Sequence, residues 1–274
     1  MTITATPVTA LPTTTAISLR GVSKAFGRHG DAVVALDNIN LDVTRGEFVC
    51  LVGASGCGKS TSLNLIAGLD RPTVGEVHVQ GRTALMFQEA ALFPWLTVRD
   101  NVALPLRLAG MGRTERHRRA EELLGRVHLG GQGGRRPHEL SGGMRQRAAL
   151  ARALAQDAEI LLMDEPFGAL DAMTRDLLHD ELEQVWVSTG LTIVFVTHNV
   201  REAARLSDRI VLLTSLPGKV ADEFPVTIDR PRRIDSPEVM GLAAAVTDRL
   251  RAEVRRHSDD MAMEHTHGDD PHGD

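Results

Sequence analysis

The sequence predicts an α/β protein with a mixed sheet, an N-terminal antiparallel β subdomain and an inserted helical lobe. Three observations predict it. Two early segments alternate apolar and polar residues, later apolar segments alternate with helical ones, and an Arg-, Leu- and Glu-rich stretch between them has helical spacing.

The early segments ISLRGVSKAF and VVALDNINLDV alternate with a period of two, as expected of an antiparallel sheet with one exposed face. The next segment, 47–52, is an almost unbroken apolar run, which is typical of a strand buried on both faces. A helix is expected to follow it from Gly58 to about Gly68.

The helical lobe is predicted over about residues 89–150, where ERHRRAEELLGRVHL has helical spacing. Strands at 159–164 and 191–198 follow, with the helix AMTRDLLHDELEQVW between them. This strand, helix, strand order favours a parallel sheet. One face of that helix is predicted to carry Leu177, Leu178, Leu182, Val185 and Trp186.

Composition sets the boundaries of the predicted domain. Residues 1–15, rich in Thr, predict a disordered leader, and 16–257 form the predicted folded domain. The tail 258–274 is acidic and His-rich without core-forming residues, so we expect it to be disordered; its histidines leave divalent-metal binding open as an alternative. No apolar run is long enough to cross a bilayer, and the N-terminus lacks the features of a secretory signal.

Charge and cysteine content exclude some function classes. The formal net charge is −5, and the last eighteen residues hold six acids and no Lys or Arg, so the body carries about +1. A near-neutral body gives no electrostatic case for nucleic acid as a partner. Two cysteines are too few for a disulfide framework, which favours a cytosolic chain.

A glycine-rich loop between the strand 47–52 and the following helix fits the pattern G-x-x-x-x-G-K-[ST]. Such a loop folds tightly, so that backbone N–H groups and the helix N-terminus face phosphate oxygens, and this context predicts a P-loop NTPase core that binds ATP and Mg²⁺. We expect the lysine to reach the β- and γ-phosphates and the serine after it to coordinate Mg²⁺. The loop consists of Gly53, Ala54, Ser55, Gly56, Cys57, Gly58, Lys59, Ser60 and Thr61.

Two carboxylates follow the apolar run 160–163. Asp164 is expected to hold Mg²⁺ through water, and Glu165 is expected to polarise the attacking water. On its own, an apolar run that ends in Asp-Glu is equally compatible with a solvated strand end. The P-loop in the same chain favours the catalytic interpretation.

His198 ends the predicted strand 191–198. A lone histidine after a strand is usually a polar terminator. Here the P-loop, the two carboxylates and His198 all follow predicted parallel strands, and ligands of open α/β sheets bind beyond the carboxyl ends of strands. We therefore expect His198 to donate a hydrogen bond to the γ-phosphate.

The segment LSGGMRQR, residues 140–147, resembles the signature motif of ATP-binding cassette (ABC) ATPases. It follows the P-loop and precedes the Asp164 strand, which is the order in that family. The resemblance implies that Ser141, Gly142 and Gly143 contact ATP. The residues themselves predict a helix start capped by Ser141, with its first amides open to an anion.

Other positions match the same family, and the resemblance covers about residues 17–230. Phe26 stands where the family has an aromatic residue that stacks on adenine, and Gln88 matches the glutamine that senses Mg²⁺ and water. The segment 168–171 resembles the loop at the dimer seam, which implies a nucleotide-site role for Asp171. Asn199 departs from the family, in which Asp is frequent after the histidine; we expect this to alter the loop charge only.

The segments LFPWLTVRDNVALPL, PHELSGGMRQR and LTSLPGKVADEFPVTIDRPR look like those of nitrate, sulfonate and taurine importers. Pro94 and Trp95 are equally compatible with a hydrophobic corner of the lobe and with a docking point for a permease helix.

The resemblance implies an ATP-hydrolysing subunit that energises an importer from the cytoplasmic face of the cell membrane. Its implied partners are permease subunits, a second ATPase copy that forms a homodimer with it and, indirectly, an extracytoplasmic solute-binding protein. Two copies would sandwich ATP between the P-loop of one and the signature of the other. The alternative is a soluble ABC-type ATPase acting on nucleic acid or ribosomes, but such proteins usually have two cassettes or a long coiled-coil insertion, and this chain has neither. A non-hydrolysing nucleotide sensor is disfavoured because Glu165 and His198 are both present.

Overall fold

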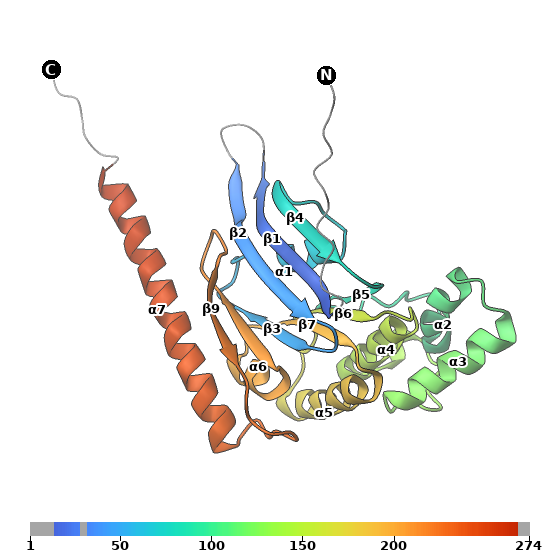
Figure 1. Cartoon of the computed structure of the whole chain (residues 1–274). Coiled ribbons are helices and arrows are strands. Elements are labelled where there is room, and N and C mark those ends of the chain that lie inside the picture. Colours follow the sequence, from blue (N-terminus) through green and yellow to red (C-terminus); the bar gives the residue numbers. More distant parts are fainter. Residues whose placement is uncertain (1–13, 28–31, 268–274) are drawn as a thin grey trace, which may run out of the picture.

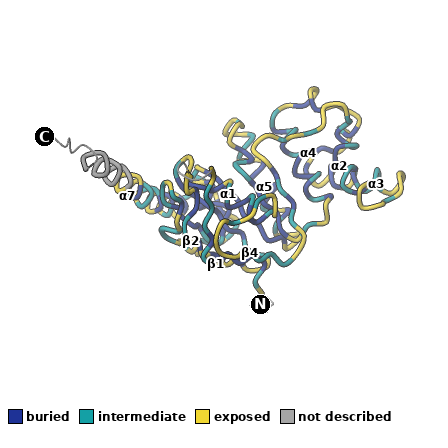
Figure 2. Tube along the Cα trace, turned by 90° about the horizontal axis from the view of Figure 1, so that it is seen from above, coloured by how far each residue is buried: buried dark blue, intermediate teal, exposed yellow. Residues whose placement is uncertain are grey.

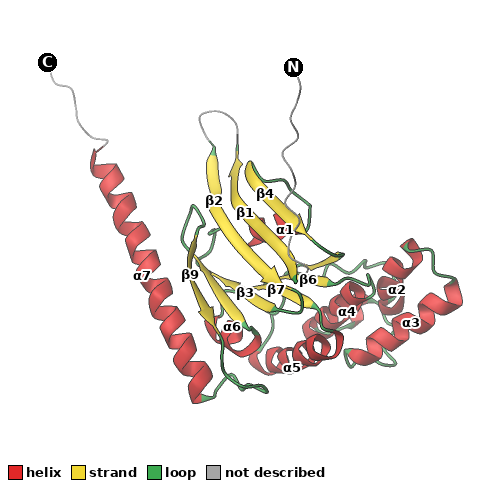
Figure 3. Cartoon of the chain, in the orientation of Figure 1, coloured by secondary structure: helices red, strands yellow, loops and turns green. Residues whose placement is uncertain are grey.

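The structure, a computed structural model, describes residues 14–27 and 32–267, with side chains as far as residue 256. Its centre is a six-stranded mixed sheet (Figures 1 and 3). Five neighbouring strands run parallel, and β9 is antiparallel to β8 at the edge. In spatial order the strands are β5 (Thr83–Met86), β6 (Ile160–Asp164), β7 (Thr192–Val196), β3 (Phe48–Val52), β8 (Arg209–Leu213) and β9 (Val220–Pro225).

A second, antiparallel sheet lies across one face of the first and confirms the predicted N-terminal β subdomain. Its order is β2 (Val33–Thr44), β1 (Thr15–Phe26) and β4 (Val74–Val79). The predicted alternation is clearest in the second half of β2, where Ile39, Leu41 and Val43 are buried and the residues between them are exposed. This pattern gives the sheet one core-facing and one solvated side.

Helix α1 (Lys59–Ile66) lies between the two sheets (Figure 1). Its Leu63, Leu65 and Ile66 belong to one hydrophobic cluster with residues of β1 and β2 on one side and of the central sheet on the other. Strand β3 is buried along its whole length, as its apolar run predicts, because helices and strands cover both of its faces.

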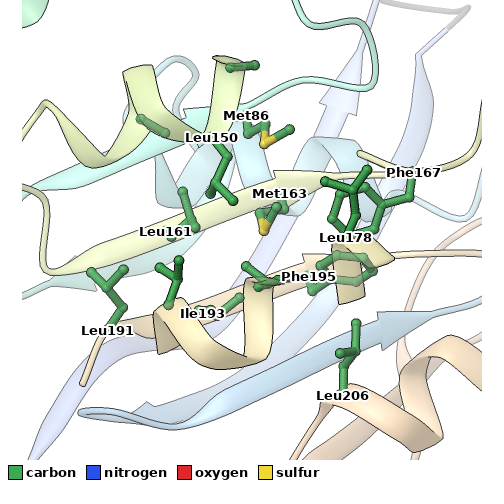
Figure 4. Close-up of a cluster of buried hydrophobic side chains, with 14 of the residues drawn as sticks. Met86, Leu150, Leu161, Met163, Phe167, Leu178, Leu191, Ile193, Phe195 and Leu206 are labelled. Atoms are coloured by element: carbon green, nitrogen blue, oxygen red, sulfur yellow. The ribbon is translucent and has the colours of Figure 1, made fainter. Parts of the chain in front are cut away.

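The opposite face of the central sheet packs against α4 (Gly142–Leu154), α5 (Ala172–Thr189) and α6 (Val200–Leu206). Figure 4 shows this cluster, in which Met163 and Phe195 from neighbouring strands face Leu178 of α5. The prediction for α5 was wrong for one residue: Leu177 is 51% exposed, and the buried face instead includes His179 and Glu181.

The predicted helical lobe consists of α2 (Val98–Leu108), α3 (Arg113–Arg126), the short 3₁₀ helix η1 (Pro137–Glu139) and α4 (Gly142–Leu154). Thr97 caps α2 by accepting a hydrogen bond from the Asp100 amide at 3.1 Å. The lobe projects from one end of the molecule, and α7 (Pro237–His267) lies at the other end (Figure 2).

Helix α7 packs on α6 through the buried residues Val239, Ala243 and Val246. The predicted disordered tail begins at residue 258, but the helical backbone continues to His267. Helical hydrogen bonds are local, so a segment without core-forming residues can continue a helix that is anchored upstream. Residues 268–274, and residues 1–13 of the predicted leader, lie outside the described residues.

Candidate nucleotide site

Four neighbouring strands bring most of the predicted site residues to one edge of the central sheet. Strands β5, β6, β7 and β3 are adjacent and parallel, so their carboxyl ends meet. Gln88 follows β5, Asp164 ends β6 with Glu165 directly after it, His198 follows β7, and the loop 53–61 follows β3. The structure therefore gathers residues that lie far apart in the sequence.

The loop after β3 depends on glycines at two points. Gly56 and Gly58 have φ values of 80° and 91°, in the left-handed region that favours glycine. A Cβ atom on Gly58 would also lie 2.4 Å from Leu36 Cδ2 and 2.8 Å from the Ala35 carbonyl oxygen. Gly58 is the N-cap of α1, so the loop leads directly into a helix N-terminus, where backbone N–H groups favour an anion.

The Lys59 side chain is folded into this loop and is only 6% exposed. Its ammonium Nζ donates hydrogen bonds to the carbonyl oxygens of Gly53 at 2.9 Å and Ala54 at 2.8 Å. The Cys57 Sγ lies 3.6 Å from the same ammonium, and burial raises the pKa of the Cys57 thiol. Cys57 is fully buried, as expected of a small residue in a tight loop.

Asp164 lies near the side chain of Ser60, the second residue of α1. Burial raises the pKa of the Asp164 carboxyl above its ordinary value, and the nearby Ser60 hydroxyl opposes the shift. A partly buried carboxylate favours a nearby cation, and carboxylate and hydroxyl oxygens are ligands that Mg²⁺ accepts. This pair therefore fits the metal that the sequence predicts.

Glu165 and His198 form a direct pair. His198 Nδ1 lies 2.9 Å from Glu165 Oε2, and the two side chains are 64% and 24% exposed, respectively. Glu165 has a φ of 43°, an unusual conformation for a residue with a side chain, and its amide donates to the Val196 carbonyl at 3.0 Å. Such a strained backbone persists only where the surrounding structure holds it in place, and strained residues cluster at functional sites.

Gln88 lies beside this pair at the junction with the lobe. A Cβ atom on Gly168 would be 3.8 Å from both Gln88 Nε2 and Glu165 Oε2, so the amide and the carboxylate approach the same point. The Gln88 carbonyl accepts a hydrogen bond from Gln146 Nε2 of α4 at 2.6 Å. Gln88 thus joins the sheet edge to the helix that follows the SGG segment.

The predicted residues Ser141, Gly142, Gly143 and Asp171 form a second group at the N-termini of α4 and α5. Ser141 caps α4 by accepting from the Met144 amide at 3.3 Å, which confirms its predicted cap. Asp171 caps α5 by accepting from the Thr174 amide at 3.0 Å. The helices approach closely here, because a Cβ on Gly143 would lie 2.3 Å from Thr174 Cγ2. Within residues 14–27 and 32–256, no hydrogen bond or ion pair connects this second group with the loop 53–61.

Phe26, at the end of β1, is 46% exposed. The Lys24 ammonium lies 4.9 Å from the centre of its ring, and its neighbour in β2 is Val33. An exposed ring is available for stacking on a base, and that role stays a prediction.

Gly218, which no sequence pattern assigns to the site, follows β8 and lies against the P-loop. Its amide donates to the Ala35 carbonyl at 2.9 Å, and a Cβ on it would lie 2.1 Å from the Cys57 carbonyl oxygen. The Leu-Pro-Gly sequence indicates a turn, but nothing in it reveals that the turn lies against the phosphate loop.

Comparison with known proteins finds a matching family and similar proteins for this chain. A family model described as "ABC transporter" matches residues 36–168. The chain is 49% identical to a taurine import ATP-binding protein of Sinorhizobium fredii, covering 73% of this chain and 78% of the relative. It is 45% identical to an aliphatic sulfonates import ATP-binding protein of Mesorhizobium japonicum, covering 86% and 88% of the two chains.

Among solved structures, the chain is similar to a dimeric ATP-binding cassette in a post-hydrolysis state bound to ADP and Pi. The TM-score is 0.70 at 35% identity, and the match covers 78% of this chain and 100% of the other. In the part of the chain that the structure describes, no helix is both long enough and apolar enough to span a membrane.

Proposed function

Since this chain belongs to the ABC transporter family of ATP-binding proteins, we propose that its sheet-edge residues form half of a nucleotide site shared with a second copy. The chain is an ATP hydrolase that energises an ABC importer. The proposal rests on one observation. The carboxyl ends of four adjacent parallel strands position Gln88, Asp164, Glu165, His198 and the P-loop at one edge of the sheet.

The P-loop side of the site would bind the phosphates. Backbone N–H groups at the start of α1 attract phosphate oxygens, and Lys59 is already held at the centre of the loop. Bound ATP would compete with the Gly53 and Ala54 carbonyl groups for the Lys59 ammonium. Ser60 and Asp164 would hold Mg²⁺, whose charge neutralises phosphate oxygens when it is bound.

The Glu165–His198 pair would act on the attacking water and the terminal phosphate. The Glu165 carboxylate would accept a hydrogen bond from the water and polarise it. His198 faces the Glu165 carboxylate through Nδ1, which therefore donates, and its Nε2 makes no hydrogen bond to any described residue. Nε2 would donate to the γ-phosphate in the imidazolium form, in which both ring nitrogens carry a proton. Catalysis of this kind depends mainly on positioning and charge stabilisation.

Two features support the proposed partners. The Ser141 group has no hydrogen bond to the P-loop in the described part of its own chain, and a similar cassette is described as dimeric, which supports completion of the site by a second copy. On the lobe side, the ring centroids of Phe93 and Trp95 lie 5.4 Å apart with the rings tilted by 45°, and Trp95 is 67% exposed. We assign this pair to permease docking at the cytoplasmic face of the membrane.

The proposed cargo is a sulfonate-type anion such as taurine or an aliphatic sulfonate. This rests on the two relatives, whose names specify import of those compounds. The residues of this chain do not select the anion, because the transported solute binds elsewhere in the transporter.

The roles of Lys59 and Glu165 are tested by two substitutions in the full chain. Lys59→Ala should abolish ATP binding or turnover, and Glu165→Gln should keep ATP binding while slowing phosphate release by at least about 10²-fold. Nucleotide affinity and phosphate release are measured for both variants. Glu122→Gln, a surface change on α3, is the control and should match the unmodified chain. Normal turnover by Glu165→Gln would exclude the role proposed for Glu165.

A further inference from the structure

His179 of α5 lies between the two loops that carry Glu165 and His198. Its side chain is completely buried, although it is polar and ionisable. Buried polar groups are retained where hydrogen bonds satisfy them, so the contacts of His179 show what it holds in place.

On one side, His179 is bound to the loop of His198. Its Nε2 lies 2.6 Å from Glu202 Oε1, and the other oxygen of Glu202 accepts a hydrogen bond from the Thr197 hydroxyl. The Thr197 hydroxyl oxygen in turn accepts from the Asn199 amide at 3.0 Å. Thr197 and Asn199 are the two chain neighbours of His198, so this network fixes the backbone on both sides of it.

On the other side, His179 contacts the loop of Glu165. The imidazole packs edge to face against the ring of Phe167, with centroids 5.5 Å apart. Phe167 is buried two residues after Glu165 and also contacts Phe195 of β7 at 5.8 Å (Figure 4). The His179 side chain is therefore connected both to the loop of His198 and to the loop of Glu165.

The contacts also define which imidazole nitrogen donates. His179 Nδ1 makes no hydrogen bond to a described residue and lies 3.8 Å from Asp176 Oδ1, whereas Nε2 faces at 2.6 Å a carboxylate that already accepts from Thr197. A carboxylate only accepts, so Nε2 carries the proton that bonds Glu202. A side chain with an N–H at that point is required to keep Glu202 in place.

We propose that His179 is a positioning residue for ATP hydrolysis, which sets the placement of His198 relative to Glu165 by joining their loops beneath the site. The inference rests on the roles proposed above for those two residues. Apart from its contact with Glu165, the mostly exposed His198 is held by its neighbours in the chain, so loss of the His179–Glu202 bond would let it shift. A displacement of about 1 Å at a reacting group can lower a rate about 100-fold.

The test compares His179→Leu, which removes the donor, with His179→Gln, whose amide nitrogen can replace Nε2–H. The matched control is Val185→Ala, a buried change six residues further along α5. ATP turnover is measured on the full chain, with Tm as the measure of folding. We expect kcat of His179→Leu to fall about 10- to 100-fold with KM for ATP within about twofold of normal, and His179→Gln to recover most of kcat. Val185→Ala should lower Tm without changing kcat.

A double-mutant cycle with His198→Ala shows whether His179 acts through His198. The cost of His179→Leu should largely disappear in the His198→Ala background, because only contacts within one network are non-additive. Full additivity, or a kcat for His179→Leu equal to that of Val185→Ala, would overturn the inference. If Glu165→Gln still hydrolyses ATP normally, the proposed site fails; if only the His179 variants behave normally, this inference alone fails.

Discussion

Asp164 and Asp171 show how the surroundings of a carboxylate determine the sign of its effect on stability. Burial raises the pKa of Asp164, whereas hydrogen bonds from the Thr174 hydroxyl and amide lower the pKa of Asp171. The pKa of Asp164 in the folded chain is above 3.8, its ordinary value. The carboxyl therefore destabilises the nucleotide-free fold increasingly as the pH rises from 3.8 through this higher pKa. Asp171 stabilises the fold above that ordinary value, and its contribution is lost as pH falls through its depressed pKa.

We expect Asp164→Asn to raise the Tm of the nucleotide-free chain at pH 7 by about 2–4 °C, because it removes a partly buried charge. The same change should abolish Mg²⁺-dependent ATP turnover, since stability and activity conflict at such a site. Calorimetry at pH 7 and at lower pH provides the measurement, and the gain should shrink as the wild-type carboxyl becomes protonated. Asp171→Asn is the matched control and should lower Tm, because an amide offers only one oxygen to Thr174. A lower Tm for Asp164→Asn would contradict the argument.

At the scale of elements, helix α5 shows what periodicity can and cannot predict. The predicted apolar face is correct for Leu178, Leu182 and Val185, but Leu177 is exposed, and His179 and Glu181 are buried. Their partners, Glu202 on α6 and Arg147 on α4, lie on other elements. Periodicity within one helix carries no information about such partners, so the sequence could not predict this polar part of the core.

The strands show the same limit. The apolar runs of β3, β6 and β7 predicted buried parallel strands, and with them the convergence of the P-loop, the two carboxylates and His198. Strand β5 has only four residues, too few for a periodic pattern, yet it is the strand that positions Gln88. Gln88 was found only through the family resemblance, and Gly218 was missed because its role depends on a contact with a distant loop.

Arg147 and Glu181 form an ion pair that connects the lobe helix α4 to α5. The Arg147 Nη2 and Glu181 Oε1 atoms are 2.9 Å apart, and the Glu181 side chain is 7% exposed. Burial raises the pKa of Glu181, and the Arg147 charge opposes that shift. We expect Arg147→Met to lower the free energy of unfolding by about 3 kcal/mol, because it leaves a buried carboxylate without its partner. Urea unfolding at neutral pH measures this change.

The control for that experiment is Arg118→Met, which removes surface ion pairs with Glu115 and Glu122 on α3. Such exposed pairs contribute at most about 1 kcal/mol. The Arg147→Met deficit should also decrease at lower pH, because protonation removes the unpaired charge of Glu181, and the double variant Arg147→Met with Glu181→Leu should regain stability. Equal losses for Arg147→Met and Arg118→Met would show that burial does not determine the effect.

At the scale of the whole molecule, the predicted site residues form two separate groups within the described part of the chain. The P-loop group lies at the edge of the central sheet, and the Ser141 group lies where α4 and α5 meet. A Cβ atom on Gly142 would lie 3.4 Å from Leu170 Cδ2, and one on Gly143 would lie 2.3 Å from Thr174 Cγ2 of the same chain. The proposal that each ATP lies between the P-loop of one copy and the Ser141 segment of the other therefore makes a prediction about mixed dimers.

Consider a Lys59→Ala chain mixed with a Ser141→Arg chain. Each homodimer contains two damaged sites. In the mixed dimer, a shared site gives one site damaged twice and one fully intact, because the unmodified P-loop of one copy faces the unmodified Ser141 of the other. A site built within one chain would have no intact copy in any combination. We therefore expect tight nucleotide trapping to be absent in each pure variant and to return in the mixture.

Trapping is the suitable measurement because it does not require both sites of a dimer to hydrolyse ATP together. Ser141 is also the N-cap of α4, so Ser141→Arg is expected to cost about 1 kcal/mol of stability, and its folding has to be verified by Tm before mixing. Formation of mixed dimers is verified by two different affinity tags carried by the two variants. If both variants are folded and mixed dimers form, but the mixture traps no more nucleotide than the pure variants, the site is not shared. In that case Ser141 would serve only to cap α4, and the nucleotide would have to be held by the sheet-edge residues of a single chain.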